Sequence, residues 1–126
     1  MKLLVVEDNE INRKLLREVL KHKGHTAEEV GTAAEAIAAL ERMPAPDVVL
    51  LDIDIPGGGL TVASHIRATP ALAGTTVIAL TAFAMPGDRE RFLAAGCHGY
   101  ISKPIEVKAF TAQVEAIVGE ARLREV

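Results

Sequence analysis

Short uninterrupted apolar runs alternate along the chain with longer stretches in which apolar residues recur every three or four positions. The runs at residues 3–6, 48–51 and 77–80 predict strands buried on both faces, as in a parallel sheet covered by helices. Two weaker strands are predicted at 26–30, which is polar enough for a sheet edge, and at 99–101.

The stretches between these runs have helical periodicity. The first predicted helix presents one apolar face, formed by Ile11, Leu15, Leu16, Val19 and Leu20, and Gly24 follows as its stop signal. A second helix is predicted to begin at Thr32, which forms a capping box with Glu35, and to end before Pro44.

Three further helices complete the pattern. One covers residues 60–68, and the next has Pro86 in its first turn and ends at Gly96. The last helix has an apolar face formed by Val107, Phe110, Val114, Ile117 and Ala121. A strand and a helix thus alternate about five times, which predicts an α/β fold with an open, doubly wound parallel sheet. We expect one domain over residues 1–126, with no second domain.

Polar residues follow four of the predicted strands at the point where each strand ends: Glu7, Asp8, Asp52, Asp54, Thr81 and Lys103. The carboxyl ends of parallel strands share one edge of a sheet, where such folds bind their ligands. Clustered carboxylates repel one another unless a cation neutralises them, and oxygen ligands suit Mg²⁺. A carboxylate can attack phosphorus, while a lysine and a hydroxyl bind the phosphoryl oxygens. Each residue alone has an ordinary role as a cap or a solvated side chain, but together they predict phosphoryl transfer.

Composition narrows the choice of partners. Of the 126 residues 49% are hydrophobic and only 3% aromatic, so the core must be largely aliphatic. The net charge is -3 and the basic residues are scattered, which argues against nucleic acid or a membrane surface as the partner. Cys97 is the single cysteine, so no intramolecular disulfide can form, and the first apolar run is too short for a signal peptide. We therefore expect a cytoplasmic protein.

Four segments carry a resemblance to a known family: LLVVEDNEINRKLL, VVLLDIDIP, VIALTAFAM and GYISKP. In this order and spacing they resemble the receiver domain of two-component response regulators over essentially the whole chain. The resemblance implies a flavodoxin-like fold, with five parallel strands in the order 2-1-3-4-5. It also implies a phosphorylation-dependent switch that receives its phosphoryl group from the phosphohistidine of a histidine kinase or phosphotransfer domain.

The resemblance assigns roles to the acidic residues. Asp52 is similar to the phosphoacceptor of the family, and Asp8 to the acid that binds Mg²⁺ directly. Glu7 resembles the acid that usually acts through a water molecule. The main-chain carbonyl of Asp54 would supply a further metal ligand. The Asp54 side chain stands at a position where the family varies and where the rate of hydrolysis is often tuned.

The remaining positions match the switch machinery of the family. Thr81 corresponds to the switch hydroxyl, Tyr100 to the switch aromatic residue and Lys103 to the phosphate-binding lysine. The bond between Lys103 and Pro104 is expected to be cis. The surface of the fourth helix, fifth strand and last helix is expected to bind a kinase or target protein. Such a domain catalyses only its own phosphorylation and dephosphorylation, so it is not expected to be a conventional enzyme.

Within the family, TAFAMPGDRERFLAAGCHGYISKPI is similar to DivK-type single-domain regulators and to the receivers of hybrid histidine kinases. One departure follows Pro56, where Gly57, Gly58 and Gly59 form a loop one residue shorter than usual. Three glycines predict a flexible loop and an atypical contact with a kinase.

Three other hypotheses compete with this interpretation. Asp52 and Asp54 resemble the two aspartates of haloacid-dehalogenase-type phosphatases, but the motif lies in mid-chain and nothing in the sequence can serve as a cap domain. A flavodoxin would share the fold, but Glu7 and Asp8 would repel its phosphate. A receiver acting purely as a binding module is the third, and the complete set of site residues argues against it.

Overall fold

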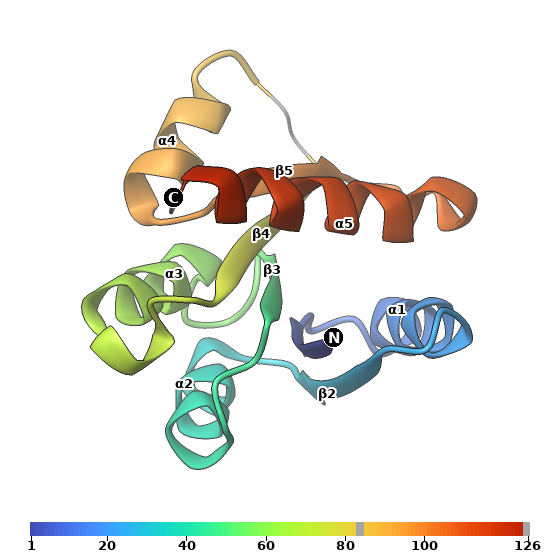
Figure 1. Ribbon diagram of the computed structural model, residues 1–126, viewed down its shortest axis with the longest axis horizontal. Coiled ribbons are helices and arrows are strands. Elements are labelled where there is room, and N and C mark those ends of the chain that lie inside the picture. Colours follow the sequence, from blue (N-terminus) through green and yellow to red (C-terminus); the bar gives the residue numbers. More distant parts are fainter. Residues whose placement is uncertain (83–84, 125–126) are drawn as a thin grey trace.

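The computed structural model describes residues 1–82 and 85–124. Within these ranges five parallel strands form one sheet in the order β2-β1-β3-β4-β5, with helices on both faces (Figure 1). The strands are β1 (Lys2–Val6), β2 (Thr26–Val30), β3 (Val48–Asp52), β4 (Thr76–Thr81) and β5 (Gly99–Ser102). The predicted fold class and strand order are confirmed, and β2 lies at an edge of the sheet as its polarity indicated.

Helices α1 (Glu10–His22) and α5 (Val107–Arg124) cover one face of the sheet. The other face is covered by α2 (Ala33–Arg42), α3 (Gly59–Ala68) and α4 (Asp88–Ala95), and a 3₁₀ turn, η1 (Pro70–Leu72), leads into β4. In the described part of the chain, none of the helices combines the length and apolar character needed to cross a bilayer.

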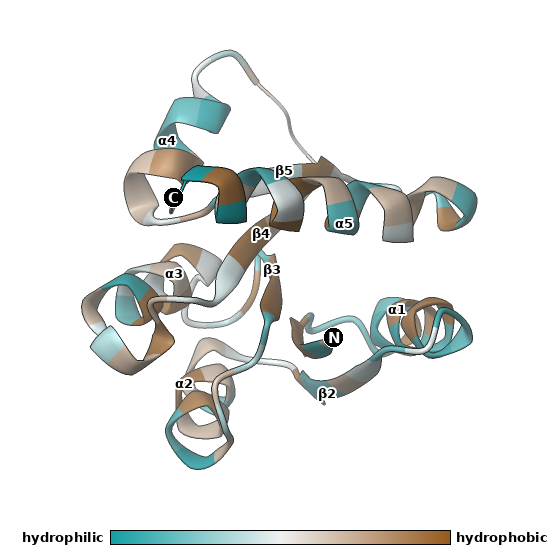
Figure 2. Ribbon diagram, viewed as in Figure 1, coloured by the Kyte–Doolittle hydropathy of each residue, from teal (hydrophilic) through white to brown (hydrophobic). Residues whose placement is uncertain are grey.

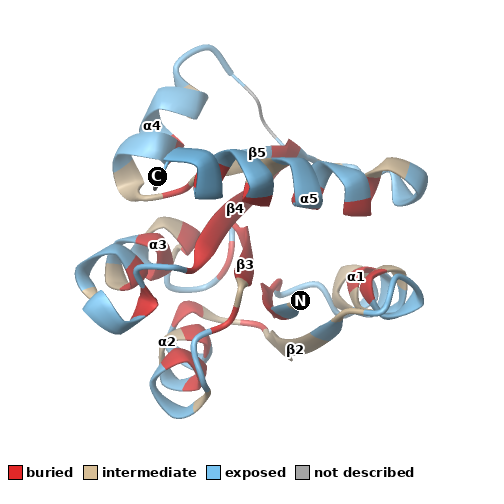
Figure 3. Cartoon of the chain, in the orientation of Figure 1, coloured by how far each residue is buried: buried red, intermediate tan, exposed pale blue. Residues whose placement is uncertain are grey.

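Two largely aliphatic cores, each with one buried phenylalanine (Phe92 and Phe110), lie on the two faces of the sheet. Side chains alternate along a strand, so Val48 and Leu50 pack toward α1 and α5, whereas Val49 and Leu51 pack toward α2 and α3. Strands β3 and β4 consist mainly of apolar residues (Figure 2), and their residues are buried (Figure 3). Burial of each such aliphatic side chain contributes about 1.5–3 kcal/mol. The central strands are therefore the rigid base from which the site residues project.

Local capping explains where several helices begin and end. The Thr32 hydroxyl accepts a hydrogen bond from the Glu35 N–H at 3.1 Å, as predicted, and stabilises the first turn of α2. The Glu35 carboxylate reaches the N–H of Gly31 at 3.3 Å, one residue before the cap. Gly96 ends α4 with a φ of 111°, in the left-handed region that a residue without a side chain adopts readily.

The predicted position of Pro86 in the first turn of α4 is wrong. The helix begins at Asp88, and Gly87 is the N-cap residue with a φ of 92°. The Asp88 N–H donates to the Met85 carbonyl at 3.0 Å, and the Asp88 carboxylate accepts from the Met85 N–H at 2.9 Å. These two bonds close a turn around Pro86 and Gly87, so the proline lies just before the helix.

The apolar face predicted for α1 is only partly buried. Leu16 and Leu20 are almost completely buried, whereas Ile11 is 79% exposed and Leu15 is 38% exposed. The periodicity of the sequence contains two adjacent apolar rows, and the helix turns only one of them into the core. The other row remains on the surface beside the polar edge of the sheet.

Candidate functional site

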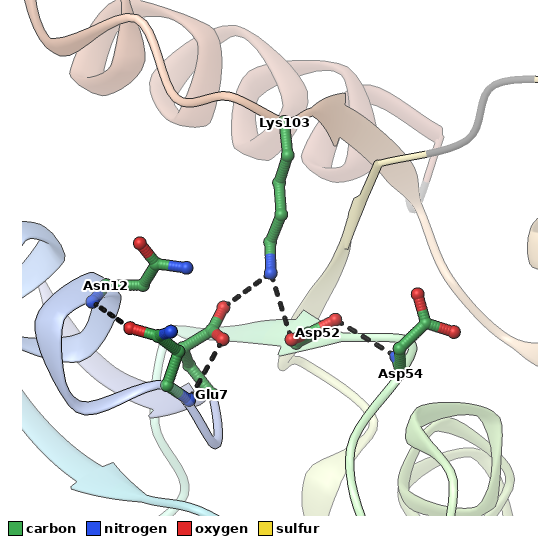
Figure 4. A network of polar contacts seen from close by, with 6 residues as sticks. Glu7, Asn12, Asp52, Asp54 and Lys103 are labelled. Atoms are coloured by element: carbon green, nitrogen blue, oxygen red, sulfur yellow. Dashed lines mark hydrogen bonds and ion pairs between the residues drawn. The ribbon is translucent and has the colours of Figure 1, made fainter.

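The alternation of side chains brings three of the predicted residues to the same side of the sheet. Glu7 continues the row of Leu3 and Val5, Asp52 continues that of Val48 and Leu50, and Lys103 continues that of Ile101. All of these rows face α1 and α5. The three polar side chains therefore meet where β1, β3 and β5 end (Figure 4).

Lys103 bridges the two buried acids. Its ammonium nitrogen lies 2.7 Å from Oε2 of Glu7 and 2.9 Å from Oδ2 of Asp52. The side chains of Glu7 and Asp52 are only 1% and 5% exposed, respectively. The main-chain N–H groups of Asn9 and Asp54 donate to the remaining carboxylate oxygens, at 3.2 Å to Glu7 and 3.0 Å to Asp52. The lysine is thus an internal counter-ion held between two carboxylates.

The cluster of Glu7, Asp52 and Lys103 contains more negative than positive charge. Burial raises the pKa of Glu7, the hydrogen bond from Lys103 opposes this effect, and the neighbouring Asp52 adds to it. Burial alone would lower the pKa of Lys103, but its hydrogen bonds to Glu7 and Asp52 outweigh burial and raise it. The lysine is therefore charged at neutral pH. One ammonium group faces two carboxylates, so a further cation would be stabilised here.

This imbalance predicts how stability depends on pH. Because its pKa is raised in the folded state, Glu7 binds a proton more tightly there than in the unfolded chain. Without a divalent cation, the free energy of unfolding of the native protein should therefore fall relative to Glu7→Gln as the pH rises above 4.5, the ordinary pKa of a glutamate.

Urea denaturation at several pH values in a chelator measures this difference. Glu41→Gln, at an exposed position, is the matched control and should follow the native protein. Parallel curves for the native protein and Glu7→Gln would show that ionisation of Glu7 does not oppose folding.

Three acids lie close enough together to share a metal ion. Glu7, Asp8 and Asp52 each offer a carboxylate oxygen, and these oxygens lie within 4.8 Å of one another. Asp8 is exposed, so the group opens to solvent on that side. An all-oxygen set with an open side is the donor chemistry that Mg²⁺ prefers. The residues present fit this ion, and the unbalanced charge of the buried acids favours it.

Thr81 and Tyr100 lie on the other side of the sheet. Tyr100 pairs with Ala79 in the register of β4 and β5, and Thr81 continues the row of Ala79. Thr81 is buried at the end of β4, next to Leu80, which is the register partner of Asp52. Tyr100 is 37% exposed, and its ring centroid lies 6.2 Å from that of Phe92. The bond between Lys103 and Pro104 is cis, as the resemblance implied.

A cleft of about 370 Å³ adjoins Lys103 and was not predicted. Its walls come from α1 and from the segments that follow β4 and β5, and its lining residues include Asn12, Leu15, Leu16, Ala82, Pro104 and Ile105. Glu7 and Lys103 are part of the same lining. The sequence predicts one apolar helix face that includes Leu15 and Leu16, and the second apolar row on α1 is the signal that could have indicated a surface role.

Comparisons with known proteins identify relatives over nearly the full chain. Residues 3–115 match the family model described as the response regulator receiver domain. The polar-differentiation response regulators DivK of Brucella ovis and Brucella anthropi are 40% identical over 120 residues, which covers 94% of this chain and 97% of theirs.

Solved structures agree with the sequence matches. The receiver domain of a sensor histidine kinase from Pseudomonas aeruginosa, solved with magnesium coordinated in its active-site cleft, is 31% identical with a TM-score of 0.83. The alignment covers 94% of this chain and 97% of that one. A putative response regulator from Chloroflexus aurantiacus has a TM-score of 0.86 at 25% identity, with 94% and 97% of the two chains covered.

The family match over residues 3–115, the DivK relatives and the acidic strand ends agree with one another. The chain therefore belongs to the response regulator receiver domain family, and it is a phosphorylation-dependent switch of two-component signalling.

Proposed function

We propose that Asp52 accepts a phosphoryl group from a phosphohistidine, with Mg²⁺ held by the neighbouring acids. The observation that carries this proposal is the pairing of Asp52 with Lys103 at 2.9 Å, at a strand end where Glu7 and Asp8 supply further oxygens within 4.8 Å. A nucleophile, a fixed cation and a set of metal ligands are the components that phosphoryl transfer requires.

In the proposed step, a carboxylate oxygen of Asp52 attacks phosphorus. The new O–P bond forms an acyl phosphate, and the P–N bond to the donor imidazole breaks. The imidazole nitrogen keeps the electron pair of that bond and takes up a proton from solvent. The ammonium group of Lys103 pairs with the Asp52 carboxylate before transfer and with the phosphoryl oxygens after it. The Thr81 hydroxyl donates a hydrogen bond to one of these oxygens. The chain thereby promotes its own phosphorylation and later hydrolysis, rather than turnover of a separate substrate.

The proposed metal site consists of Asp8 and Asp52 as direct ligands, Glu7 through a water molecule and the main-chain carbonyl of Asp54. When bound, Mg²⁺ supplies positive charge that offsets the negative phosphoryl oxygens. The hydrogen bond from the Asp54 N–H to Asp52 fixes this part of the chain beside the carboxylate.

Incubation with phosphoramidate or acetyl phosphate tests the proposed chemistry. Intact-mass measurement should show one phosphoryl group in the presence of Mg²⁺ and none when the metal is chelated. A haloacid-dehalogenase-type phosphatase would instead release phosphate from p-nitrophenyl phosphate over many turnovers. Multiple turnover on that ester, without a labelled protein, would contradict the proposal.

The phosphoryl donor is proposed to be a histidine kinase or a histidine phosphotransfer domain. The transfer is proposed to take place in the cytoplasm, where ATP supplies the phosphoryl group to the kinase. The DivK relatives are response regulators matched over 97% of their length, which supports a phosphoryl donor of two-component signalling. Transfer from purified phosphorylated phosphotransfer domains tests this assignment directly.

The signal is proposed to leave through the surface formed by α4, β5 and α5. A cavity of about 150 Å³ lies there, lined in part by Phe92, Leu93, Gly99, Tyr100 and Ile117. If Thr81 turns toward the phosphoryl group, the Tyr100 ring can move from its partly exposed position into the space that Thr81 leaves. Phosphorylation would then favour one of two arrangements of this surface, where a kinase or target protein binds.

Thr81→Ala is expected to accept the phosphoryl group but to lose this response. Tyr100 is the only tyrosine and the chain has no tryptophan, so intrinsic fluorescence reports on this ring. Beryllofluoride, a mimic of the phosphoryl group, should change the fluorescence of the native protein but not that of Thr81→Ala. Thr81→Ser keeps the hydroxyl and is the control. If Thr81→Ala showed the same beryllofluoride-dependent fluorescence change as the native protein, the signal would not pass through the Thr81 hydroxyl.

A further inference from the structure

Gly59, the first residue of α3, lies against the main chain of the proposed acceptor. A Cβ atom at this position would lie 2.4 Å from the carbonyl oxygen of Asp52, 2.8 Å from Cα of Ile53 and 3.1 Å from the carbonyl carbon of Asp52. These three atoms belong to the backbone, so no side-chain rotation can relieve the overlap. Any side chain here would have to displace α3 or the peptide that joins Asp52 to Ile53.

That peptide is held from several directions. The Ile53 N–H donates to the Leu80 carbonyl at 3.2 Å, and the Gly59 N–H donates to the Ile53 carbonyl at 3.1 Å. The next residue, Asp54, donates its N–H to Oδ1 of Asp52. The start of α3 and the end of β4 therefore fix the segment that orients the carboxylate of Asp52.

The three consecutive glycines meet different requirements. Gly57 and Gly58 have φ values of 89° and 83°, so both need the conformational freedom of glycine. A Cβ on Gly58 would meet only the Thr61 hydroxyl, at 3.4 Å. Gly59 has no positive φ. A glycine is needed here because the neighbouring backbone leaves no space for a Cβ atom. The sequence predicted flexibility from all three, but Gly59 contributes a close contact with Asp52.

We propose that Gly59 is a positioning residue for phosphoryl transfer. The missing side chain lets the first turn of α3 pack directly on the Asp52 carbonyl, and this contact sets the direction of the carboxylate and the place of the Asp54 main chain. The inference rests on the proposed function of Asp52. Displacement of this segment would alter both the nucleophile and a proposed metal ligand, while the surrounding core remained in place.

Gly59→Ala tests the proposal with phosphoramidate as donor, at saturating Mg²⁺ and at a temperature where the protein is folded. The maximal labelling rate should fall at least about tenfold, because misplacement of a reacting group by about 1 Å can cost a hundredfold. Mg²⁺ affinity, measured by calorimetry, should also weaken. The amide resonance of Asp54 should shift relative to the native protein.

Two glycine variants serve as matched controls. Gly74→Ala adds the same methyl group where nothing lies within 4 Å, and it should label like the native protein. Gly58→Ala strains the same loop through its positive φ without touching Asp52, so it should lose stability but keep its labelling rate within about twofold. This pair separates positioning of the acceptor from a general loss of stability.

The outcomes are distinct. Native labelling and Mg²⁺ affinity in folded Gly59→Ala would overturn the inference. If the variant unfolds, it is refolded with trimethylamine N-oxide; slow labelling of the refolded protein supports positioning, and recovery of the native rate shows a purely structural role. If the native protein is not labelled, or if Asp52→Asn is labelled equally, the proposed function itself fails.

Discussion

Asp52→Asn is expected to abolish phosphoryl labelling, with a loss on the order of a thousandfold or more, as befits removal of a nucleophile. The amide occupies the same space as the carboxylate but lacks its negative charge and nucleophilic oxygen. Lys103 lies 2.7 Å from Glu7 in the native protein and should keep this contact in the variant, so the strand ends should retain a salt bridge. Intact-mass analysis after incubation with phosphoramidate and Mg²⁺ measures the effect.

Asp47→Asn is the matched control, because this aspartate lies just before the opposite end of β3 and its side chain bonds the Lys2 N–H. It should be labelled at the native rate. Asp54→Asn separates the proposed mechanism from a phosphatase mechanism, in which the second aspartate is a general acid. Equal labelling of Asp52→Asn and the native protein would place the acceptor at another residue.

Lys103→Ala is expected to separate phosphorylation from the conformational response. Without the ammonium group, the buried carboxylates of Glu7 and Asp52 face each other with no internal counter-ion. In a chelator at neutral pH, removal of one partner from such a buried pair should cost about 3–5 kcal/mol of stability, reduced where Glu7 takes up a proton. Mg²⁺ should still bind, and more tightly, because it no longer competes with the lysine for the same oxygens.

Three measurements on Lys103→Ala check these expectations. Urea denaturation with and without Mg²⁺ gives the stability, calorimetry gives the affinity, and Tyr100 fluorescence with beryllofluoride gives the response. The fluorescence change should be lost although the metal binds. Lys108→Ala, at an exposed position of α5, is the control and should behave like the native protein. Loss of Mg²⁺ binding in Lys103→Ala would contradict the role assigned to this lysine.

The order of elements and the edge that carries the site could be predicted because both depend on local patterns. Continuous apolar runs differ from helical periodicity over a few residues, and a polar residue after a buried run identifies the end of a strand. For this reason Asp52 and Lys103 were placed at the correct strand ends. The resemblance added the roles of Thr81 and Tyr100, which remain predictions.

Some local features were beyond these patterns. The turn before α4 depends on the left-handed φ of Gly87 and on hydrogen bonds between Asp88 and Met85. Helical periodicity does not contain this information, so the prediction that Pro86 lies inside the helix is wrong. The two apolar rows of α1 look equivalent in the sequence. Only the packing of Leu16 and Leu20 against the sheet decides that Ile11 lies outside.

The sequence by itself determined the alternation of strands and helices, the parallel sheet and the residue types at its polar edge, because hydrophobic periodicity and strand ends are local properties. The tertiary structure alone decided that Lys103 bridges Glu7 and Asp52, which are 96 and 51 residues away from it in the chain. It also decided that Gly59 lies against the Asp52 carbonyl. Such contacts depend on the register of the strands and the approach of a helix to a strand end, and these are fixed only when the whole core packs.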